Sequence, residues 1–169
     1  NSVRHAIANV STARNRRERR NVDAVHARGV EASAQVRRGR FALDGALSFT
    51  DAKVEASGSS VGLDGKRPAQ VPRWAASATL AWKPRDEWRL AASVRHIGAQ
   101  FEDDLETDLI PPATTLDLVA QVPLGKAATL VLRAENVTDA RVVTRQQGLS
   151  TDLGAPRTVW AGVRVRLGS

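Results

Sequence analysis

Apolar and polar side chains alternate along most of this chain, so that every second residue is of the same kind. The even-numbered residues of 74–82 are Trp, Ala, Ala, Leu and Trp, whereas the odd-numbered ones are Ala, Ser, Thr and Ala. Beyond a short turn that contains Pro84, the even-numbered residues of 88–94 are Trp, Leu, Ala and Val, and the odd-numbered ones include Arg89 and Ser93. A period of two on both sides of a turn predicts an antiparallel hairpin with one apolar face.

The same alternation predicts about eight strands over the whole chain. They cover approximately residues 2–14, 21–37, 40–54, 73–83, 87–101, 113–123, 127–145 and 157–167. No helical periodicity competes over a comparable length. The pattern therefore predicts an all-β fold of antiparallel, up-and-down strands.

The connections between these strands alternate between short and long. Tight turns are expected at 38–39, 84–86 and 125–126, and longer links at about 15–20, 55–72, 102–112 and 146–156. A transmembrane β-barrel has this asymmetry, with short periplasmic turns and long extracellular loops. The short turns are therefore expected to face the periplasm and the acidic link at 102–108 to lie outside.

Alternation alone does not tell which face of the strands meets water. The two tryptophans at Trp74 and Trp82 are separated by ~26 Å along a strand, and a tilt of ~40° reduces this to ~20 Å of height. That height is close to the ~25 Å apolar band that aromatic girdles flank in membrane barrels. The spacing favours a membrane barrel over tryptophans in the core of a small sandwich. A self-contained eight-stranded barrel, membrane or soluble, that binds a small ligand is the alternative.

Composition narrows the chemistry further. The chain of 169 residues contains no Cys, which excludes disulfides, Cys-ligated zinc and thiol catalysis. His5, His26 and His96 are far apart in the sequence, and no Ser/His/Asp arrangement is apparent. We therefore expect no enzyme activity, no catalytic residue and no cofactor.

The net charge of +7 is unevenly distributed. The densest basic run, at 15–20, contains no aromatic residue to stack on bases, which favours a solvated loop or a lipid-phosphate contact over nucleic acid. The segment 102–108 contains five acidic residues and no basic one, but it lacks the spacing and the glycine of a calcium-binding loop. The sequence therefore predicts neither a nucleic-acid partner nor a metal site.

Short motifs in a characteristic order cover nearly the whole chain and resemble the C-terminal barrel portion of TonB-dependent outer-membrane receptors. The pair formed by ENVTD and the strand after GAPRT is the most specific. The resemblance implies a barrel of about 22 strands with a plugged lumen, of which residues 1–169 supply about the last eight, without the plug domain. The motifs are GVE at 29–31, FTDA at 49–52, GKRP at 65–68, VPR at 71–73, LDL at 116–118, ENVTD at 135–139 and GAPRT at 154–158.

The function that this resemblance implies is TonB-dependent uptake of a scarce nutrient across the outer membrane of a Gram-negative bacterium. The substrate is expected to be a ferric siderophore, or cobalamin or another metal chelate. The partners are expected to be outer-membrane lipid, and a plug domain and TonB through parts outside this chain. Two features depart from the family pattern: the chain has no Tyr, and it ends in Leu-Gly-Ser where such barrels typically end on an aromatic residue.

Because ferric siderophores are often anionic, arginines near the long links are the candidate ligand-binding residues. They are Arg95, Arg145 and Arg157. Three other motif residues, Glu31, Asn136 and Asp139, are expected to serve structure and not ligand. Finally, the apolar positions Val94, Leu118, Leu130 and Val163 are expected to face lipid, whereas Ser93 and Gln121 face the lumen.

Overall fold

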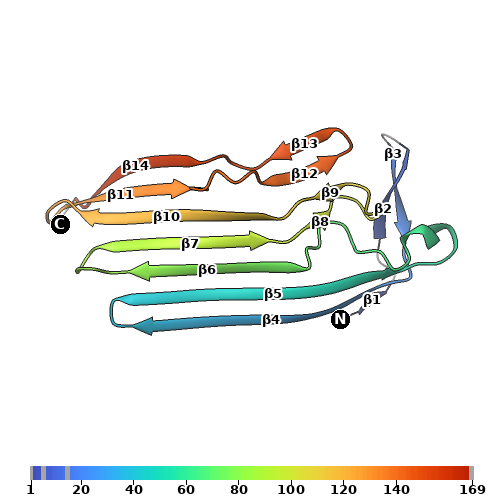
Figure 1. Cartoon of the computed structure of the whole chain (residues 1–169), viewed down its shortest axis with the longest axis horizontal. Helices are drawn as coiled ribbons and strands as arrows, with labels where there is room; N and C mark the ends of the chain where they lie inside the picture. Colours follow the sequence, from blue (N-terminus) through green and yellow to red (C-terminus); the bar gives the residue numbers. More distant parts are fainter. Residues whose placement is uncertain (1, 5–6, 14–15, 168–169) are drawn as a thin grey trace.

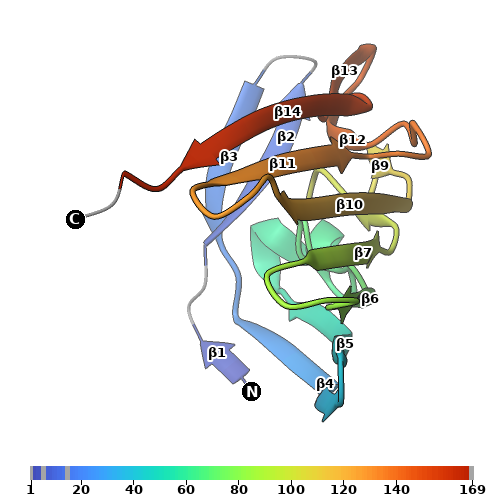
Figure 2. The same ribbon diagram turned by 90° about the vertical axis from the view of Figure 1, so that its left-hand side faces the viewer.

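A computed structural model of the chain describes residues 2–4, 7–13 and 16–167. Eight antiparallel strands form one sheet in the order β1-β4-β5-β6-β7-β10-β11-β14. Figure 1 shows them side by side, and Figure 2 shows that the sheet is curved along its width. The strands are β1 (Ser2–Arg4), β4 (Ala24–Arg38), β5 (Phe41–Glu55), β6 (Trp74–Trp82), β7 (Arg89–Ile97), β10 (Ala113–Pro123), β11 (Ala128–Glu135) and β14 (Thr158–Val165).

The sheet is open: within the described residues, β1 and β14 are its two edges and do not pair with each other. The all-β, antiparallel fold of a barrel segment that the sequence predicts is confirmed. A self-contained barrel would need its first and last strands to close the sheet, so the open edges disfavour that alternative.

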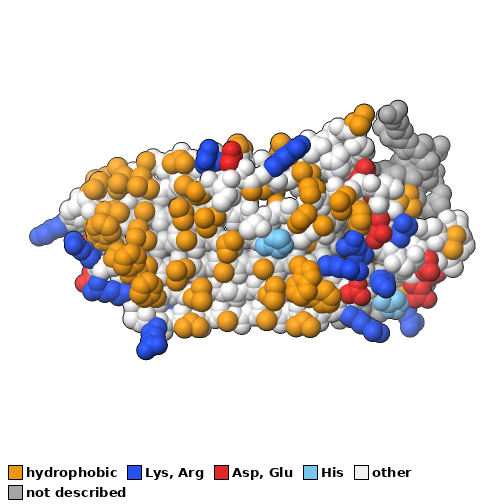
Figure 3. All heavy atoms as spheres, in the orientation of Figure 1, with side chains coloured by type: hydrophobic (Ala, Val, Ile, Leu, Met, Phe, Trp, Pro, Cys, Tyr) orange, Lys and Arg blue, Asp and Glu red, His pale blue; other side chains and the backbone are white. Residues whose placement is uncertain are grey.

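The strand register gathers the apolar side chains on one face. Leu43 pairs with Leu80, Leu116 with Val94, and Leu130 with Val163. This convex face is largely hydrophobic in Figure 3, and large side chains on it are exposed, with Leu80 at 48% and Val163 at 58%. We call it the apolar face, and the concave side the polar face. The predicted lipid-facing residues Val94, Leu118, Leu130 and Val163 all lie on the apolar face.

Two aromatic pairs border the apolar face at opposite ends of the stretch in which β5 and β6 pair. The rings of Phe49 and Trp74 lie 4.6 Å apart, and those of Phe41 and Trp82 stack at 5.9 Å. Each pair joins residues that are directly opposite in the register. Cross-strand aromatic pairs stabilise a sheet, and here they mark the two ends of its apolar band.

The predicted tight turns all lie at one end of the sheet, on the left of Figure 1. Gly39 and Gly125 adopt positive φ angles of 56° and 80°, a region that suits residues without a Cβ atom. We call this end the short-turn end. The opposite end, the loop end, carries the long links and three separate two-stranded ribbons.

The first predicted strand, 2–14, and the predicted loop at 15–20 are wrong in detail. Only β1 joins the sheet, whereas β2 (Ile7–Ala13) pairs with β3 (Arg16–Asn21) in a ribbon of its own. Residues 16–20 of the basic run therefore belong to a paired strand and not to a loop. The side chains of that run lie outside the described residues. Alternation predicted the strand state correctly but did not specify its partner.

Two further predicted strands end early. The strand predicted over 127–145 stops at Glu135, because Asn136 and Asp139 adopt left-handed φ angles of 48° and 53°. The strand predicted over 87–101 stops before Gly98, where a Cβ atom would lie 3.0 Å from the carbonyl oxygen of Trp74. The interrupted segments form short ribbons: β8 (Gln100–Phe101) pairs with β9 (Leu109–Ile110), and β12 (Val143–Gln147) with β13 (Ser150–Leu153).

A small apolar core lies at the loop end, where the 3-10 helix η1 (Gly58–Leu63) follows β5. Leu63 is 1% exposed and packs with Val22, Val54 and Ala56. Among the described residues, no helix is both long and apolar enough to span a membrane. The buried hydrophobic side chains of the described residues are therefore concentrated beside the long links, at the loop end of the sheet.

Candidate functional site

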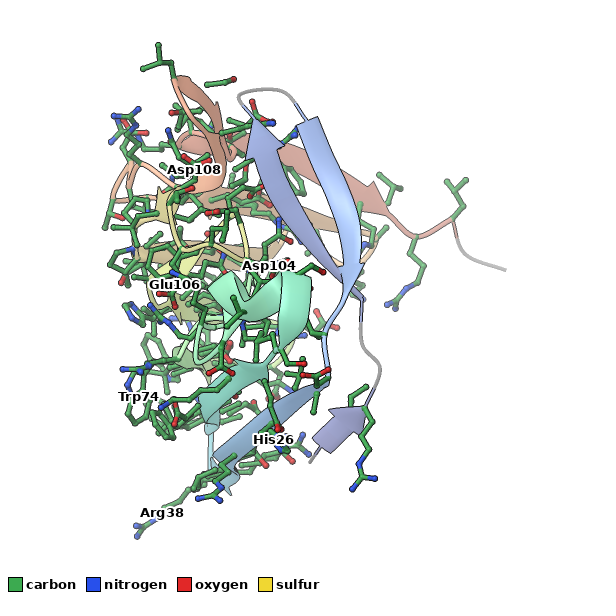
Figure 4. All side chains as sticks on the ribbon, turned by 90° about the vertical axis from the view of Figure 1, so that its right-hand side faces the viewer. His26, Arg38, Trp74, Asp104, Glu106 and Asp108 are labelled. Atoms are coloured by element: carbon green, nitrogen blue, oxygen red, sulfur yellow. The ribbon has the colours of Figure 1, made fainter. Side chains whose placement is uncertain are left out.

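The acidic segment 102–108 packs against the link between β5 and β6. The backbone N–H of Ala69 donates to Asp104 Oδ1 at 2.8 Å, and that of Arg67 donates to Glu106 Oε1 at 3.0 Å. Asp104 and Glu106 are labelled in Figure 4, next to this link at the loop end. These carboxylates brace two loops against each other, because each accepts a hydrogen bond from the backbone of the neighbouring link.

Asp103 closes the acidic segment upon itself. Its carboxylate accepts four hydrogen bonds, from the backbone of Leu105, Thr107 and Asp108 and from the hydroxyl of Thr107. Burial raises the pKa of Asp103, but these hydrogen bonds outweigh it and hold the pKa below its ordinary value of 3.8. The side chain is thus ionised at neutral pH and fully occupied by its own loop. No group of three or more His, Asp or Glu side chains in the described residues is arranged to hold a metal ion.

Arg145 joins the β12–β13 ribbon to the acidic segment. Its Nε lies 3.5 Å from Oε1 of Glu102, whose side chain is only 4% exposed. Its terminal N–H donates to Gln147 Oε1 at 2.8 Å. The backbone N–H of Gly148 also donates to Asp108 Oδ1 at 3.1 Å. One of the three predicted ligand-binding arginines therefore holds two loops together.

Asn136 fastens the ENVTD turn to the GAPRT segment. It is 5% exposed, its side-chain oxygen accepts the N–H of Ala140 at 2.9 Å, and its amide donates to the carbonyls of Ala140 and Ala155. Asp139 Oδ1 accepts the backbone N–H of Arg157 at 3.0 Å. The two motifs that are most specific in the sequence thus form one clasp at the loop end.

The polar face is hollowed near the loop end. A hollow of about 660 Å³ is lined by residues of β4, β5, β6 and β7, among them Glu31 and Arg95 at opposite sides and three serines between them, Ser33, Ser48 and Ser77. The register sets Ser77 directly opposite Arg95. In the part of the chain that the structure describes, Arg95 forms no ion pair. Its guanidinium is therefore available to an anionic ligand.

The structure does not bring the three predicted arginines together. Arg157 is exposed in the link before β14, where its backbone N–H donates to Asp139 Oδ1. Of the described residues that line the hollow, only Arg95 belongs to the predicted set. Arg145 and Arg157 instead lie in the links at the loop end.

A second polar group was missed by the sequence reasoning. The guanidinium of Arg133 lies 5.0 Å above the ring of Trp160, and its N–H donates to Glu135 Oε1 at 3.4 Å. The alternation of apolar and polar residues along β14 already indicates that Trp160 lies on the polar face. The apolar residues of β14 are odd-numbered, so the even-numbered Trp160 belongs to the polar face together with Arg164.

The family model described as TonB dependent receptor-like, beta-barrel matches residues 1–137. The chain belongs to this TonB-dependent receptor family. The metal-pseudopaline receptor CntO of Pseudomonas aeruginosa is 30% identical over 108 residues, which are 61% of this chain and 15% of that receptor. Family and neighbours are receptors and transporters and not enzymes.

Solved structures of TonB-dependent receptors share the fold. The ferric yersiniabactin uptake receptor FyuA from Yersinia pestis superposes with a TM-score of 0.75 at 20% identity, over 86% of this chain and 24% of that one. The siderophore receptor PiuA from Acinetobacter baumannii gives a TM-score of 0.72 at 17% identity, over 86% of this chain and 22% of that one. The chain thus spans about a quarter or less of the length of these relatives. The TonB-dependent receptor family resides in the outer membrane of Gram-negative bacteria.

Proposed function

We propose that this chain is part of the barrel wall of an outer-membrane receptor that takes up a metal chelate, with ferric siderophores as the substrate class. The observation that carries the proposal is the division of one curved sheet into an apolar convex face between two aromatic pairs and a polar, hollowed concave face. Such a sheet suits a wall between lipid and a water-filled passage.

In this arrangement the loop end faces outward and the short-turn end faces the periplasm, because long loops in outer-membrane barrels are extracellular. The apolar face contacts lipid. A plug domain and TonB act through other parts of the receptor, and the polar face forms the part of the lumen that the ligand passes.

The residues proposed to contact the chelate are Arg95, Arg145 and Arg157, which differ in how many of their donors are free for a ligand. Arg95 is exposed on the polar face beside the hollow and is not engaged in an ion pair of the described residues. Arg157 is exposed in the clasp between the two motifs. Arg145 is held by Glu102 and Gln147, which leaves part of its five-donor guanidinium for a ligand.

Anionic chelate oxygens suit these side chains, because guanidinium groups bind such oxygens through paired hydrogen bonds. The serines around Arg95 add hydroxyl donors and acceptors without adding charge. The hollow therefore favours a polar ligand over an apolar one, with the anionic groups of the ligand on the Arg95 side and away from Glu31.

The test is ligand binding by the full-length receptor and its Arg95→Gln variant. A panel of ferric hydroxamate, ferric catecholate and ferric citrate chelates, with cobalamin as the alternative cargo, is titrated against receptor in detergent. We expect one ferric chelate to bind and the variant to bind it about tenfold or more weakly, since a hydrogen bond to a charged group contributes ~1.5–3 kcal/mol.

The matched control is Arg164→Gln, which removes the same charge from the polar face at the short-turn end. It should leave affinity unchanged. A folded receptor that binds none of the ferric chelates would contradict the substrate class. Equal losses in both variants would contradict the role of Arg95.

A further inference from the structure

A group of cationic side chains lies on the apolar face just beyond the aromatic pair at the loop end. Arg28 is directly opposite Asp51, one step past the pair formed by Val30 and Phe49 on the same face. The register between β4 and β5 is uninterrupted along both strands, so every second residue stays on the same face. Lys53, two residues beyond Asp51, therefore also belongs to this face.

Arg73 completes the group from the last residue of the link before β6. It immediately precedes Trp74, and its terminal nitrogen lies 3.6 Å from Asp51 Oδ1. We call Arg28, Lys53 and Arg73 the basic cluster. All three side chains are exposed. Figure 3 shows blue side chains gathered at the loop end of the apolar face.

The cluster carries excess positive charge. Among the described residues, Asp51 is the one carboxylate at ion-pair distance from the cluster, and it lies 3.6 Å from Arg73. Within the described residues, neither Arg28 nor Lys53 forms an ion pair, and Glu55 is engaged with His26 at 2.7 Å. The cluster therefore holds three cations and one carboxylate, which contacts Arg73, and the surplus positive charge attracts an anion from outside the chain.

We propose that the basic cluster binds the phosphate groups of a phosphoglycolipid in the outer leaflet. The inference rests on the proposed function, which places the apolar face against lipid and the loop end outward. Aromatic side chains lie at the level of the headgroups, so cations one step beyond Phe49 and Trp74 lie at the level of lipid phosphates. The apolar face below the cluster accommodates the acyl chains of the same molecule.

The residue types suit phosphate. Arginine binds phosphate oxygens through two parallel hydrogen bonds, and lysine adds a mobile point charge. The contact with Asp51 holds the Arg73 side chain in place. Less conformational entropy is therefore lost when Arg73 binds a phosphate. A free phosphate ion would meet the same donors, but it would gain nothing from the apolar face.

The experiment uses full-length receptor, delipidated in detergent and titrated with bisphosphorylated lipid A while the bound lipid is counted by native mass spectrometry. The variant Arg28→Gln/Lys53→Gln/Arg73→Gln should bind lipid A at least about tenfold more weakly, because it removes three basic residues that attract the anionic lipid surface. Lipid A without phosphates should bind the unaltered receptor equally weakly. Inorganic phosphate at matched concentration should not displace lipid A.

The matched control is Arg38→Gln/Arg40→Gln/Lys83→Gln, which removes three cations beside the Phe41–Trp82 pair at the other end of the apolar face. It should keep its affinity for lipid A. Unchanged affinity in the cluster variant, equal loss in both variants, or displacement by inorganic phosphate would each overturn the proposal. Heat-dependent gel mobility verifies that each variant is folded.

The proposed function is scored on the same preparations. The lipid site alone is contradicted if the receptor fractionates with the outer membrane and binds a ferric chelate, but the cluster variant binds lipid A as tightly as the unaltered receptor. A receptor absent from the outer-membrane fraction contradicts the proposed function itself.

Discussion

The middle of the sheet and its loop end are held together by different interactions. In the middle, from β5 to β11, backbone ladders join regular strands, and the large apolar side chains are exposed on the convex face. At the loop end, buried carboxylates and Asn136 bind backbone groups of distant links, and a small core surrounds Leu63. The middle therefore depends on what surrounds the protein, whereas the loop end supplies most of its own contacts.

This contrast is explained by the solvent that each region is proposed to meet. A lipid-facing surface needs no internal core, because the bilayer covers its apolar side chains. Where the links fold onto one another, their backbone groups are shielded from water and need protein partners, which buried carboxylates and Asn136 supply here.

The largest effect is expected from a charge on the apolar face. Leu118→Arg should destabilise the folded receptor in a bilayer by ~2–4 kcal/mol, because it places a charge near the centre of the apolar band. Gln121→Arg on the polar face should cost far less. The measurement is unfolding by urea or guanidinium in lipid vesicles, and equal costs at both positions would remove the distinction between the faces.

An intermediate effect is expected at the clasp. Asn136→Ala removes the partners of Ala140 and Ala155 at a position that is 5% exposed, and it replaces a residue that favours its left-handed φ. We expect ~1–3 kcal/mol lower stability, the usual cost of unsatisfied buried groups. Gln147→Ala, in the exposed ribbon, is the control. If both variants unfold at the same denaturant concentration, the clasp is not a structural element.

The smallest effect is expected from acidification of the loop end. Because the pKa of Asp103 is lowered in the folded chain, its contribution to stability is present above 3.8 and is lost as the pH falls through the lowered value. Amide hydrogen exchange of Thr107 and Asp108 should therefore accelerate in acid relative to amides of β10, after correction for intrinsic rates. Asp103→Ala, which removes the acceptor Oδ1 of both amides, should already exchange quickly at neutral pH. Protection of these amides in that variant would show that the carboxylate does not hold the loop.

Much of the middle region could be predicted from the sequence, because period-two alternation is a local property. The hairpin around Trp82 and the face that Leu118 occupies follow directly from it. The alternation along β14 also indicates the face on which Trp160 lies. Its contact with Arg133 could not be predicted, because that contact depends on the register with the neighbouring strand β11.

The loop end could be predicted only in outline. Alternation does not specify partners, so it did not separate β2 and β3 from the sheet. The end of β11 depends on the left-handed Asn136, whose three side-chain hydrogen bonds reach Ala140 and Ala155. Such contacts between links distant in sequence leave no periodic trace. The predicted set of three arginines was likewise built on position along the chain, and only Arg95 reaches the hollow.

The two ends of this sheet are proposed to lie on opposite sides of a membrane, and single cysteines test this topology most directly. The chain has no native Cys, and Leu149, at the tip of the β12–β13 ribbon, is 95% exposed. A membrane-impermeant maleimide on intact cells should label Leu149→Cys in the full-length receptor, and it should label Arg85→Cys at the short-turn end only after permeabilisation. Labelling of Arg85→Cys on intact cells, with Leu149→Cys protected, would contradict the account.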